Sequence, residues 1–515
     1  METIGCHNSF LIVKLRGLSV LSPPVFMGFF RQFGGVIMAF ENLQPKEVFH
    51  FFEEICSIPH GSGNLQKISN YLVKFAMERN LEFIQDGELN VIIKAPASPG
   101  YEDREPVILQ GHMDMVAVKE DSSDINMLTD GLRVKTDGEY VWAEGTSLGG
   151  DDGIAVAYCL ALLDSKDIPH PPLEVVITTN EETGMFGATA IDLSSLAGKK
   201  LINIDNEEEG AFIVSCAGGA RVYSELSVKR VASAGKRLKV EVSGLLGGHS
   251  GEMIIKGRGN ANIILARTLL EALDSADFNL ETIGGGVADN AIPNISSAIV
   301  SLDPSKTEVF KASVSKSLED IKGELEVKDP DVNITVKELE DGNEAVISPE
   351  DTKKALSLIC VMPDGVQAMS SSVEGLVETS LNLGILKTSE DMVTIEQSVR
   401  SSVSSSKDFL IRKIRTISEG YGAKVKVSGS YPGWKYRQKS ELRDHMVSVY
   451  KEMYGVEPRI LAIHAGLECG ILSEKIEGLD CISIGPDMQD IHSTKEKLSV
   501  RSASNVWDYL KAVLK

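Results

Sequence analysis

Five short apolar runs, separated by stretches with helical spacing, constrain the fold of this chain more than any other feature. Each run is apolar at consecutive positions, so the strand it forms must be buried on both faces. Stretches between them, such as DDGIAVAYCLALLDS (151–165), have the length and apolar spacing of helices. Strands and helices that alternate in this way predict an α/β fold with a largely parallel sheet. The five runs are NVIIKA (90–95), PVILQ (106–110), LEVVITT (173–179), KLINID (200–205) and LDCISIG (479–485).

The middle of the chain has a different pattern. Between residues 220 and 430, apolar and polar residues alternate in runs such as RLKVEVSG (237–244) and DMVTIEQSVR (391–400). Alternation predicts a sheet with one face in solvent, and therefore an α+β domain inserted into the first. A chain of 515 residues also exceeds what one core normally serves. We expect a first domain made of residues 38–219 and 431–515, with 220–430 inserted.

Composition excludes several classes of protein. The chain has 74 acidic and 52 basic residues and a formal charge of -22, which opposes binding to nucleic acid or to anionic membranes. No stretch reaches the roughly 18 to 20 apolar residues of a membrane span. Seven scattered cysteines without a Cys-x-x-Cys pair indicate a reducing, cytoplasmic location and no disulfide framework. The oligomeric state stays open, with a homodimer as one candidate.

The first 37 residues differ from the rest. They are apolar, contain glycine, and carry Lys14, Arg16 and Arg31 against the single acid Glu2. This composition fits either a targeting segment or an upstream extension of the reading frame. The second interpretation is favoured, because Met38 opens a segment that soon takes up helical spacing. Two amphipathic helices are expected there, in LQPKEVFHFFEEICSI and NLQKISNYLVKFAMERNL.

Acidic and imidazole side chains follow the predicted strands. Ligands of an open α/β sheet bind beyond the carboxyl ends of its strands, and a glycine-rich turn, GTSLGGDDG, brings a further pair of carboxylates before a helix. Each piece alone has a simple structural explanation: a solvated loop, a helix N-cap or a surface histidine. The residues are His112 and Asp114, Glu181 and Glu182, Asp205, His492, and Asp151 with Asp152.

Together these groups need a cation. Converging carboxylates and imidazoles would repel one another or go unpaired without one, so the sequence predicts a pair of divalent metal ions. Imidazole and carboxylate ligands without thiolate suit Zn²⁺, or Co²⁺ and Mn²⁺, better than Mg²⁺ or Ca²⁺. Two such ions that share a carboxylate can polarise a carbonyl and generate hydroxide near neutral pH.

The chain resembles the M20 metallopeptidases, and within them the aminoacyl-histidine (Xaa-His or β-alanyl-histidine) dipeptidase branch. The resemblance runs from about Met38 to the C-terminus, and its motifs are long and in the family's order. The resemblance implies a mostly parallel-sheet di-metal catalytic domain with an inserted α+β lid domain, acting on unblocked dipeptides. The motifs are EICSIPHGSG, GHMDMV, GTSLGGDDGIAVA, TTNEETGMFGA, INIDNEEEG, GLLGGHSG, ADNAIPN, MSSSVEGLVETSLNLG, IHAGLECGIL and IGPDMQDIHSTKE.

The family pattern implies a role for each residue at the metals. Asp151 would bridge the two ions, with His112 and Asp205 at one and Glu182 and His492 at the other. Glu181 would be the general base that takes a proton from the metal-bridging water and gives it to the leaving amine. Asp114 would orient the imidazole of His112, because residues i and i+2 of a strand point the same way.

The resemblance also assigns substrate-binding residues, three of them in the inserted domain. His249 would lie near the developing oxyanion, with Asn290 assisting, and Arg400 would bind the substrate's C-terminal carboxylate. His464 is expected to line the site without a defined role. Two positions depart from the branch: Asp152, where relatives often have Asn, and Asp289, where they often have a basic residue.

Other classes of hydrolase fit less well. The sequence GGHSGEM does not match the Gly-x-Ser-x-Gly of serine hydrolases, and no His-Glu-x-x-His is present. The alternatives that remain are an M20 tripeptidase, aminoacylase or deacetylase acting on another amide, and a non-catalytic peptide-binding protein. The intact Glu181 argues against the last, because a binding protein has no need of a general base.

Overall fold

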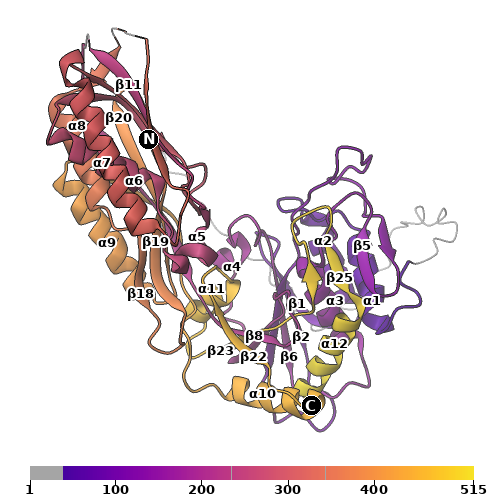
Figure 1. Cartoon of the computed structure of the whole chain (residues 1–515). Coiled ribbons are helices and arrows are strands. Elements are labelled where there is room, and N and C mark those ends of the chain that lie inside the picture. Colours follow the sequence, from indigo (N-terminus) through magenta and orange to yellow (C-terminus); the bar gives the residue numbers. More distant parts are fainter. Residues whose placement is uncertain (1–38, 233–234, 341, 343) are drawn as a thin grey trace, which may run out of the picture. The chain divides into compact units, whose positions relative to one another are not determined.

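The computed structural model describes residues 39–232, 235–340, 342 and 344–515 (Figure 1). The extension 1–37 lies outside the described residues. The chain divides into two compact units: unit 1 comprises the described residues up to Ile213 with 439–460 and 475–515, and unit 2 comprises 214–438 with 461–474. Among the helices of the described ranges, none combines the length and the hydropathy that a membrane span requires.

The centre of unit 1 is an eight-stranded sheet that contains all five predicted apolar strands. The four central strands, β6, β3, β7 and β23, run parallel to one another. At the edges, β1 and β2 pair antiparallel, as do β2 with β6 and β23 with β8. The mostly parallel α/β class is therefore confirmed, with antiparallel strands added outside the parallel centre. In spatial order the strands are β1 (Glu82–Gln85), β2 (Val91–Ala95), β6 (Leu173–Thr178), β3 (Val107–His112), β7 (Lys200–Asn203), β23 (Asp480–Ser483), β8 (Ala211–Cys216) and β22 (Arg459–Ile463).

Helices supply the apolar cover of this sheet. The two predicted N-terminal helices are α1 and α2, and their predicted apolar positions, such as Phe52 and Leu72, are buried. Helix α3 begins in the glycine-rich turn, is buried along nearly its whole length, and packs against α1 and β3. The helices of unit 1 are α1 (Lys46–Cys56), α2 (Gln66–Glu78), α3 (Gly150–Asp164), α4 (Phe186–Ala190), α10 (Glu441–Tyr454) and α12 (Val500–Leu514).

A smaller sheet in unit 1 supports the segment that carries His492. Strands β24 and β25 pair antiparallel, with Gln489 opposite Lys497, so the residues between them form a closed loop. Strand β25 in turn pairs with β5. The strands are β24 (Met488–Gln489), β25 (Lys497–Ser499), β5 (Tyr140–Ala143) and β4 (Val134–Thr136).

Unit 2 is built on a nine-stranded antiparallel sheet. The predicted alternation is present in β11, where Leu238, Val240 and Val242 are buried and the residues between them are partly exposed. Strand β18 (Gly365–Met369) pairs with β19 beside the main order. In that order the strands are β16 (Asn333–Glu338), β11 (Lys236–Ser243), β15 (Ser296–Leu302), β13 (Phe278–Gly285), β19 (Val377–Thr388), β20 (Met392–Ser401), β9 (Gly218–Ser227) and β21 (Lys424–Tyr431).

The long helices of unit 2 lie along one face of this sheet (Figure 1). Their apolar side chains, among them Leu265, Phe310, Leu356 and Ile414, join the buried strand residues in one core. A sheet covered on one face only is the α+β arrangement that the alternating pattern predicts. The helices of unit 2 are α5 (Ser250–Met253), α6 (Ala261–Leu273), α7 (Thr307–Leu325), α8 (Pro349–Val361) and α9 (Ser404–Gly420), and α11 (Glu468–Lys475) begins in this unit. Two short ladders complete it, and they pair β10 (Arg230–Ala232) with β17 (Ala345–Ile347) and β12 (Gly248–His249) with β14 (Ala291–Ile292).

Candidate metal centre

The predicted ligands of unit 1 meet beyond the ends of its central parallel strands. His112 is the last residue of β3, and Asp205 follows β7 by two residues. Glu182 follows β6, and Asp151 lies in the first turn of α3. His492 comes from the loop between β24 and β25. One end of the sheet thus gathers side chains that are far apart in the sequence.

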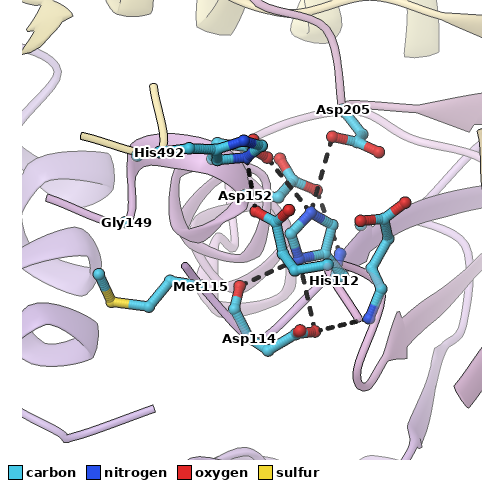
Figure 2. A network of polar contacts seen from close by, with 12 residues as sticks. His112, Asp114, Met115, Gly149, Asp152, Asp205 and His492 are labelled. Carbon is cyan, nitrogen blue, oxygen red and sulfur yellow. Dashed lines mark hydrogen bonds and ion pairs between the residues drawn. The ribbon is translucent and has the colours of Figure 1, made fainter. Parts of the chain in front are cut away.

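His112 is at the middle of this group (Figure 2). Its side chain is buried, and its Nε2 atom lies 3.2 Å from Oδ1 of Asp151 and 3.7 Å from Oδ1 of Asp205. On the other side of the ring, Nδ1 lies 3.0 Å from the backbone oxygen of Asp114 and 3.6 Å from its carboxylate. A donor bond from Nδ1 leaves Nε2 as the atom that faces the acidic cluster.

The carboxylate of Asp151 lies between two imidazoles. Its Oδ1 faces His112, and its Oδ2 is 3.1 Å from Nε2 of His492. The same nitrogen of His492 is 2.9 Å from Oε1 of Glu182. One carboxylate with an oxygen toward each of two ligand groups has the geometry of a bridge.

Asp114 connects the predicted ligand His112 to the predicted base Glu181. Besides its contact with His112, its Oδ1 atom accepts the backbone N–H of Glu181 at 3.1 Å. Its Oδ2 atom accepts the hydroxyl of Ser62 at 2.7 Å. The side chain is buried, so these bonds hold Asp114 in one orientation.

The electrostatics of the cluster favour positive charge on both histidines. Hydrogen bonds to Asp151 and Glu182 raise the pKa of His492 to about 10, against the effect of burial. Burial lowers the pKa of His112, yet hydrogen bonds to three carboxylates outweigh it and raise that pKa well above its ordinary value. Burial is the main cause that raises the pKa of both Glu182 and Asp205. Such a group draws in protons or a metal cation to balance its negative charge.

The donor atoms fit a metal pair. Two groups have ligand atoms that all lie within 4.8 Å of one another: His112, Asp151 and Glu182, and His112, Asp152 and Asp205. Oδ1 of Asp151 and Oε1 of Glu182 are buried, and each faces an imidazole nitrogen: Nε2 of His112 at 3.2 Å and Nε2 of His492 at 2.9 Å. Buried carboxylates are costly unless a cation compensates their charge. The individual ligand roles remain predictions.

Asp152 lies deeper than its neighbours. Its Oδ2 atom accepts the backbone N–H of His112 at 3.1 Å, and its side chain is fully buried. Burial, with the charge of Asp205, raises the pKa of Asp152 well above the ordinary range. A carboxyl group whose pKa is raised takes up a proton more readily, which reduces the negative charge beside the predicted ligands.

A second cluster, in unit 2, contains three of the residues that the resemblance assigned to substrate binding. Arg400, on β20, donates from Nη1 to the backbone oxygen of His464 at 3.4 Å. His464 Nε2 lies 2.7 Å from the hydroxyl of Ser380. A Cβ at Gly251 would lie 2.9 Å from His249 Cε1 and 3.0 Å from the backbone oxygen of His464, so these two residues are neighbours. His464 falls in the predicted segment 431–515, whereas residues 461–474 group with unit 2.

Cationic charge dominates this second cluster. Burial and the charge of Arg400 lower the pKa of His464 to about 4, and the same two causes lower the pKa of His249. The buried Nε atom of Arg400 has no hydrogen-bond partner among the described residues. Two neutral imidazoles beside a guanidinium suit the binding of an anionic group.

Asn290 and Asp289 lie next to this cluster. The backbone oxygen of Asn290 accepts the N–H of Ser250 at 2.7 Å. The side chain of Asn290 takes no part in this bond and is exposed. Asp289 forms an ion pair with Arg221 of β9. The acidic residue at this position therefore has its own basic partner within unit 2.

Two residues that strand patterns do not single out, Ser62 and Glu496, contact the predicted centre in the structure. Ser62, in the motif EICSIPHGSG, donates to Asp114, and Glu496, the last residue of IGPDMQDIHSTKE, accepts backbone N–H groups of the glycine-rich turn. Both residues stand inside motifs that carried the resemblance. Their position in those motifs was the available signal, but neither follows a predicted strand.

Comparisons with known proteins agree with this geometry. Residues 108–515 match the model of peptidase family M20/M25/M40. The cytosol non-specific dipeptidase of Escherichia coli (strain K12) is 35% identical over 476 residues, which are 92% of this chain and 98% of that protein. The crystal structure of aminoacylhistidine dipeptidase from Vibrio alginolyticus is 36% identical, with a TM-score of 0.88 over 92% of this chain and 97% of that one.

A more distant structure shares only the fold. The aminopeptidase PepT from Bacillus cereus has a TM-score of 0.53 at 16% identity, over 92% of this chain and 98% of that chain. The family match covers most of the sequence, and the relatives at about one-third identity match it over nearly their full lengths. The chain therefore belongs to peptidase family M20/M25/M40.

Proposed function

We propose that this protein is a metal-dependent dipeptidase that hydrolyses unblocked dipeptides, including Xaa-His and β-alanyl-histidine types. Membership of a peptidase family and full-length similarity to two dipeptidases support the substrate class. The observation that carries the chemistry is the carboxylate of Asp151, whose two oxygens lie 3.2 and 3.1 Å from the Nε2 atoms of His112 and His492. The name of the Escherichia coli relative supports a cytoplasmic location.

The proposed cofactors are two divalent cations, with Zn²⁺ preferred over the alternatives Co²⁺ and Mn²⁺. Asp151 would bridge them, His112 and Asp205 would complete one site, and Glu182 and His492 the other. When bound, such a pair polarises the scissile carbonyl and lowers the pKa of water. Imidazole with carboxylate is a donor set that zinc accepts.

Glu181 is the proposed general base. It would accept a proton from the attacking water and deliver it to the nitrogen of the leaving amino acid, so that no net proton is gained or lost by the side chain. Asp114 supports this role because it binds the backbone N–H of Glu181 while it holds His112. One buried residue thus contacts both the proposed base, through its carboxylate, and a proposed metal ligand, through its backbone oxygen.

Unit 2 is the proposed substrate-binding lid. Arg400 would bind the C-terminal carboxylate of the dipeptide, since its guanidinium can make paired charge-assisted hydrogen bonds. His249, with Asn290, would stabilise the oxyanion that forms on the scissile carbonyl. The contact between Arg400 and the backbone of His464 supports a fixed orientation for the guanidinium.

A panel of substrates tests the proposal. The zinc-loaded protein is incubated with β-alanyl-histidine, a second dipeptide, a tripeptide and an N-acetyl amino acid, and kcat/KM is measured for each. We expect the unblocked dipeptides to be hydrolysed fastest. Preference for the tripeptide or for the N-acetyl amino acid would favour an M20 tripeptidase or an aminoacylase, and no hydrolysis of any substrate would favour a peptide-binding protein.

A further inference from the structure

Glu496 has a buried carboxylate close to the proposed metal centre that no step above uses. It is four residues beyond His492, and its side chain is among the buried polar groups of unit 1. Its carboxylate accepts successive backbone N–H groups of the glycine-rich turn before α3: Leu148 at 2.7 Å and Gly149 at 3.0 Å to Oε2, and Gly150 at 2.8 Å and Asp151 at 3.4 Å to Oε1.

The turn is shaped around this carboxylate. Gly149 has φ 68°, in the left-handed region that favours glycine, and a Cβ there would lie 2.8 Å from Sδ of Met115. A Cβ at Gly150 would lie 3.3 Å from Oε1 of Glu496. Successive N–H groups that converge in this way form a site for an anion, and here the chain's own Glu496 fills it.

The backbone of Glu496 belongs to the loop that carries His492. Residues 490–496 are closed by the pairing of Gln489 with Lys497 in β24 and β25. Within this loop His492 has φ 59°, a conformation that a residue other than glycine adopts only where its surroundings fix it. The loop therefore has to be held in place for His492 to point at Asp151.

We propose that Glu496 is a positioning residue for the metal pair. Its carboxylate joins the turn that presents Asp151 to the loop that presents His492, two segments separated by more than 300 residues in the sequence. His492 and the proposed bridging carboxylate of Asp151 thereby keep a fixed separation. This inference rests on the proposed metal pair of the preceding section.

Glu174 provides a matched control in the same unit. It is buried too, and its carboxylate accepts the backbone N–H groups of Ala197, at 3.0 Å, and Gly198, at 2.8 Å. It lies at the start of β6, whereas Glu181 and Glu182 follow the end of that strand. Loss of either carboxylate leaves backbone N–H groups unpaired, but only Glu496 contacts the turn of Asp151.

The test compares Glu496→Gln with Glu174→Gln in the full-length protein. Zn²⁺ affinity is measured by competition with a chelating indicator, the visible absorption of Co²⁺-loaded protein reports ligand geometry, and thermal unfolding reports stability. We expect Glu496→Gln to bind Zn²⁺ about 10- to 100-fold more weakly, as supporting residues of metal sites do when replaced, and to show a changed Co²⁺ spectrum. Glu174→Gln should keep wild-type affinity and spectrum even if it unfolds at a lower temperature.

Glu496→Asp covers the case in which Glu496→Gln does not fold. Aspartate keeps the charged carboxylate but is one methylene shorter, so we expect Glu496→Asp to bind Zn²⁺ more weakly than the wild type does. Where Glu496→Gln also folds, the affinity of Glu496→Asp should lie between those of the wild type and Glu496→Gln. Wild-type affinity and spectrum in the folded Glu496 variants, or equal weakening by Glu174→Gln, would overturn the inference. A wild-type protein that binds two ions but hydrolyses no dipeptide would refute the proposed function instead, and the metal titrations would still decide the role of Glu496.

Discussion

The two clusters of this protein use histidine in opposite ways. In unit 1 carboxylates surround His112 and His492 and raise the pKa of both. In unit 2 burial and the guanidinium of Arg400 lower the pKa of His249 and His464. The same side chain is thus placed in an anionic environment in one unit and in a cationic one in the other.

This difference assigns complementary ligands to the two units. A cluster that draws in positive charge is suited to metal ions, and a cluster that excludes protons beside a guanidinium is suited to a carboxylate or an oxyanion. A dipeptide carries a free carboxylate and develops an oxyanion during hydrolysis. The contrast between the units therefore supports the proposed roles of the two clusters, metal binding in unit 1 and binding of anionic substrate groups in unit 2.

Removal of metal should have the largest effect, because it acts on the whole anionic cluster of unit 1. We expect the purified protein to contain two divalent ions per chain, and treatment with a strong chelator to abolish hydrolysis. Activity should return on addition of Zn²⁺ or Co²⁺, since the ligands stay in place. Elemental analysis and activity before and after chelation check this, and a fully active protein without metal would remove the basis of the comparison.

Glu181 and Glu182 should separate the two roles within unit 1. Glu181→Gln should retain both ions and the fold while kcat falls by about 10²- to 10⁴-fold, the usual contribution of a positioned general base. The same substitution at the next residue, Glu182→Gln, should instead weaken metal binding. Added Zn²⁺ should then restore part of the activity of this variant. Metal content and kcat measured on both variants distinguish the residues, and the opposite pattern of metal loss would exchange their roles.

The sequence predicted the cluster of unit 1 from general principles. Parallel strands end at the same edge of a sheet, so residues at or just beyond the ends of 106–110, 173–179 and 200–205 had to meet. The apolar runs were long enough to be recognised as strands without any relative. What strand periodicity could not supply was the hydrogen bonding of Glu496 and Ser62, because it depends on how loops fold back onto the sheet.

The cluster of unit 2 was predicted only through the resemblance. His249 lies in a two-residue strand and His464 just beyond β22, so neither position follows from a regular pattern. Their proximity to Arg400 depends on how segments outside the nine-stranded sheet fold onto it: His464, beyond β22, contacts Ser380 of β19 and Arg400 of β20. The antiparallel edges of the sheet in unit 1 were missed for a related reason: an apolar run shows that a strand is buried but not the direction of its neighbour.

Replacement of Arg400, in the cationic cluster of unit 2, should have the next largest effect on activity. Arg400→Ala removes the guanidinium proposed to bind the substrate carboxylate, and we expect kcat/KM for dipeptides to fall about 10- to 100-fold, the worth of hydrogen bonds to a charged group. Arg400→Lys should recover little, because an ammonium cannot make the paired contact. Metal content should equal that of the wild type in both, and a loss of metal would mean that the two clusters are not independent.

The smallest expected effect is on the acid stability of unit 2. Because burial and Arg400 lower the pKa of His464 to about 4, the unfolded chain binds a proton at this residue more readily than the folded chain does. Stability that is present above the ordinary histidine pKa of about 6.5 should therefore be lost as the pH falls toward about 4, by at most about 1.4 kcal/mol per pH unit for one group. His464→Gln cannot take up this proton, so its unfolding temperature should fall less than that of the wild type between about pH 7 and pH 4.5. Arg400→Ala should reduce this pH dependence of the unfolding temperature in part, since the charge of Arg400 is the second cause that lowers the pKa of His464. Identical pH profiles for all three proteins would show that the cationic environment of His464 does not contribute to the stability of unit 2.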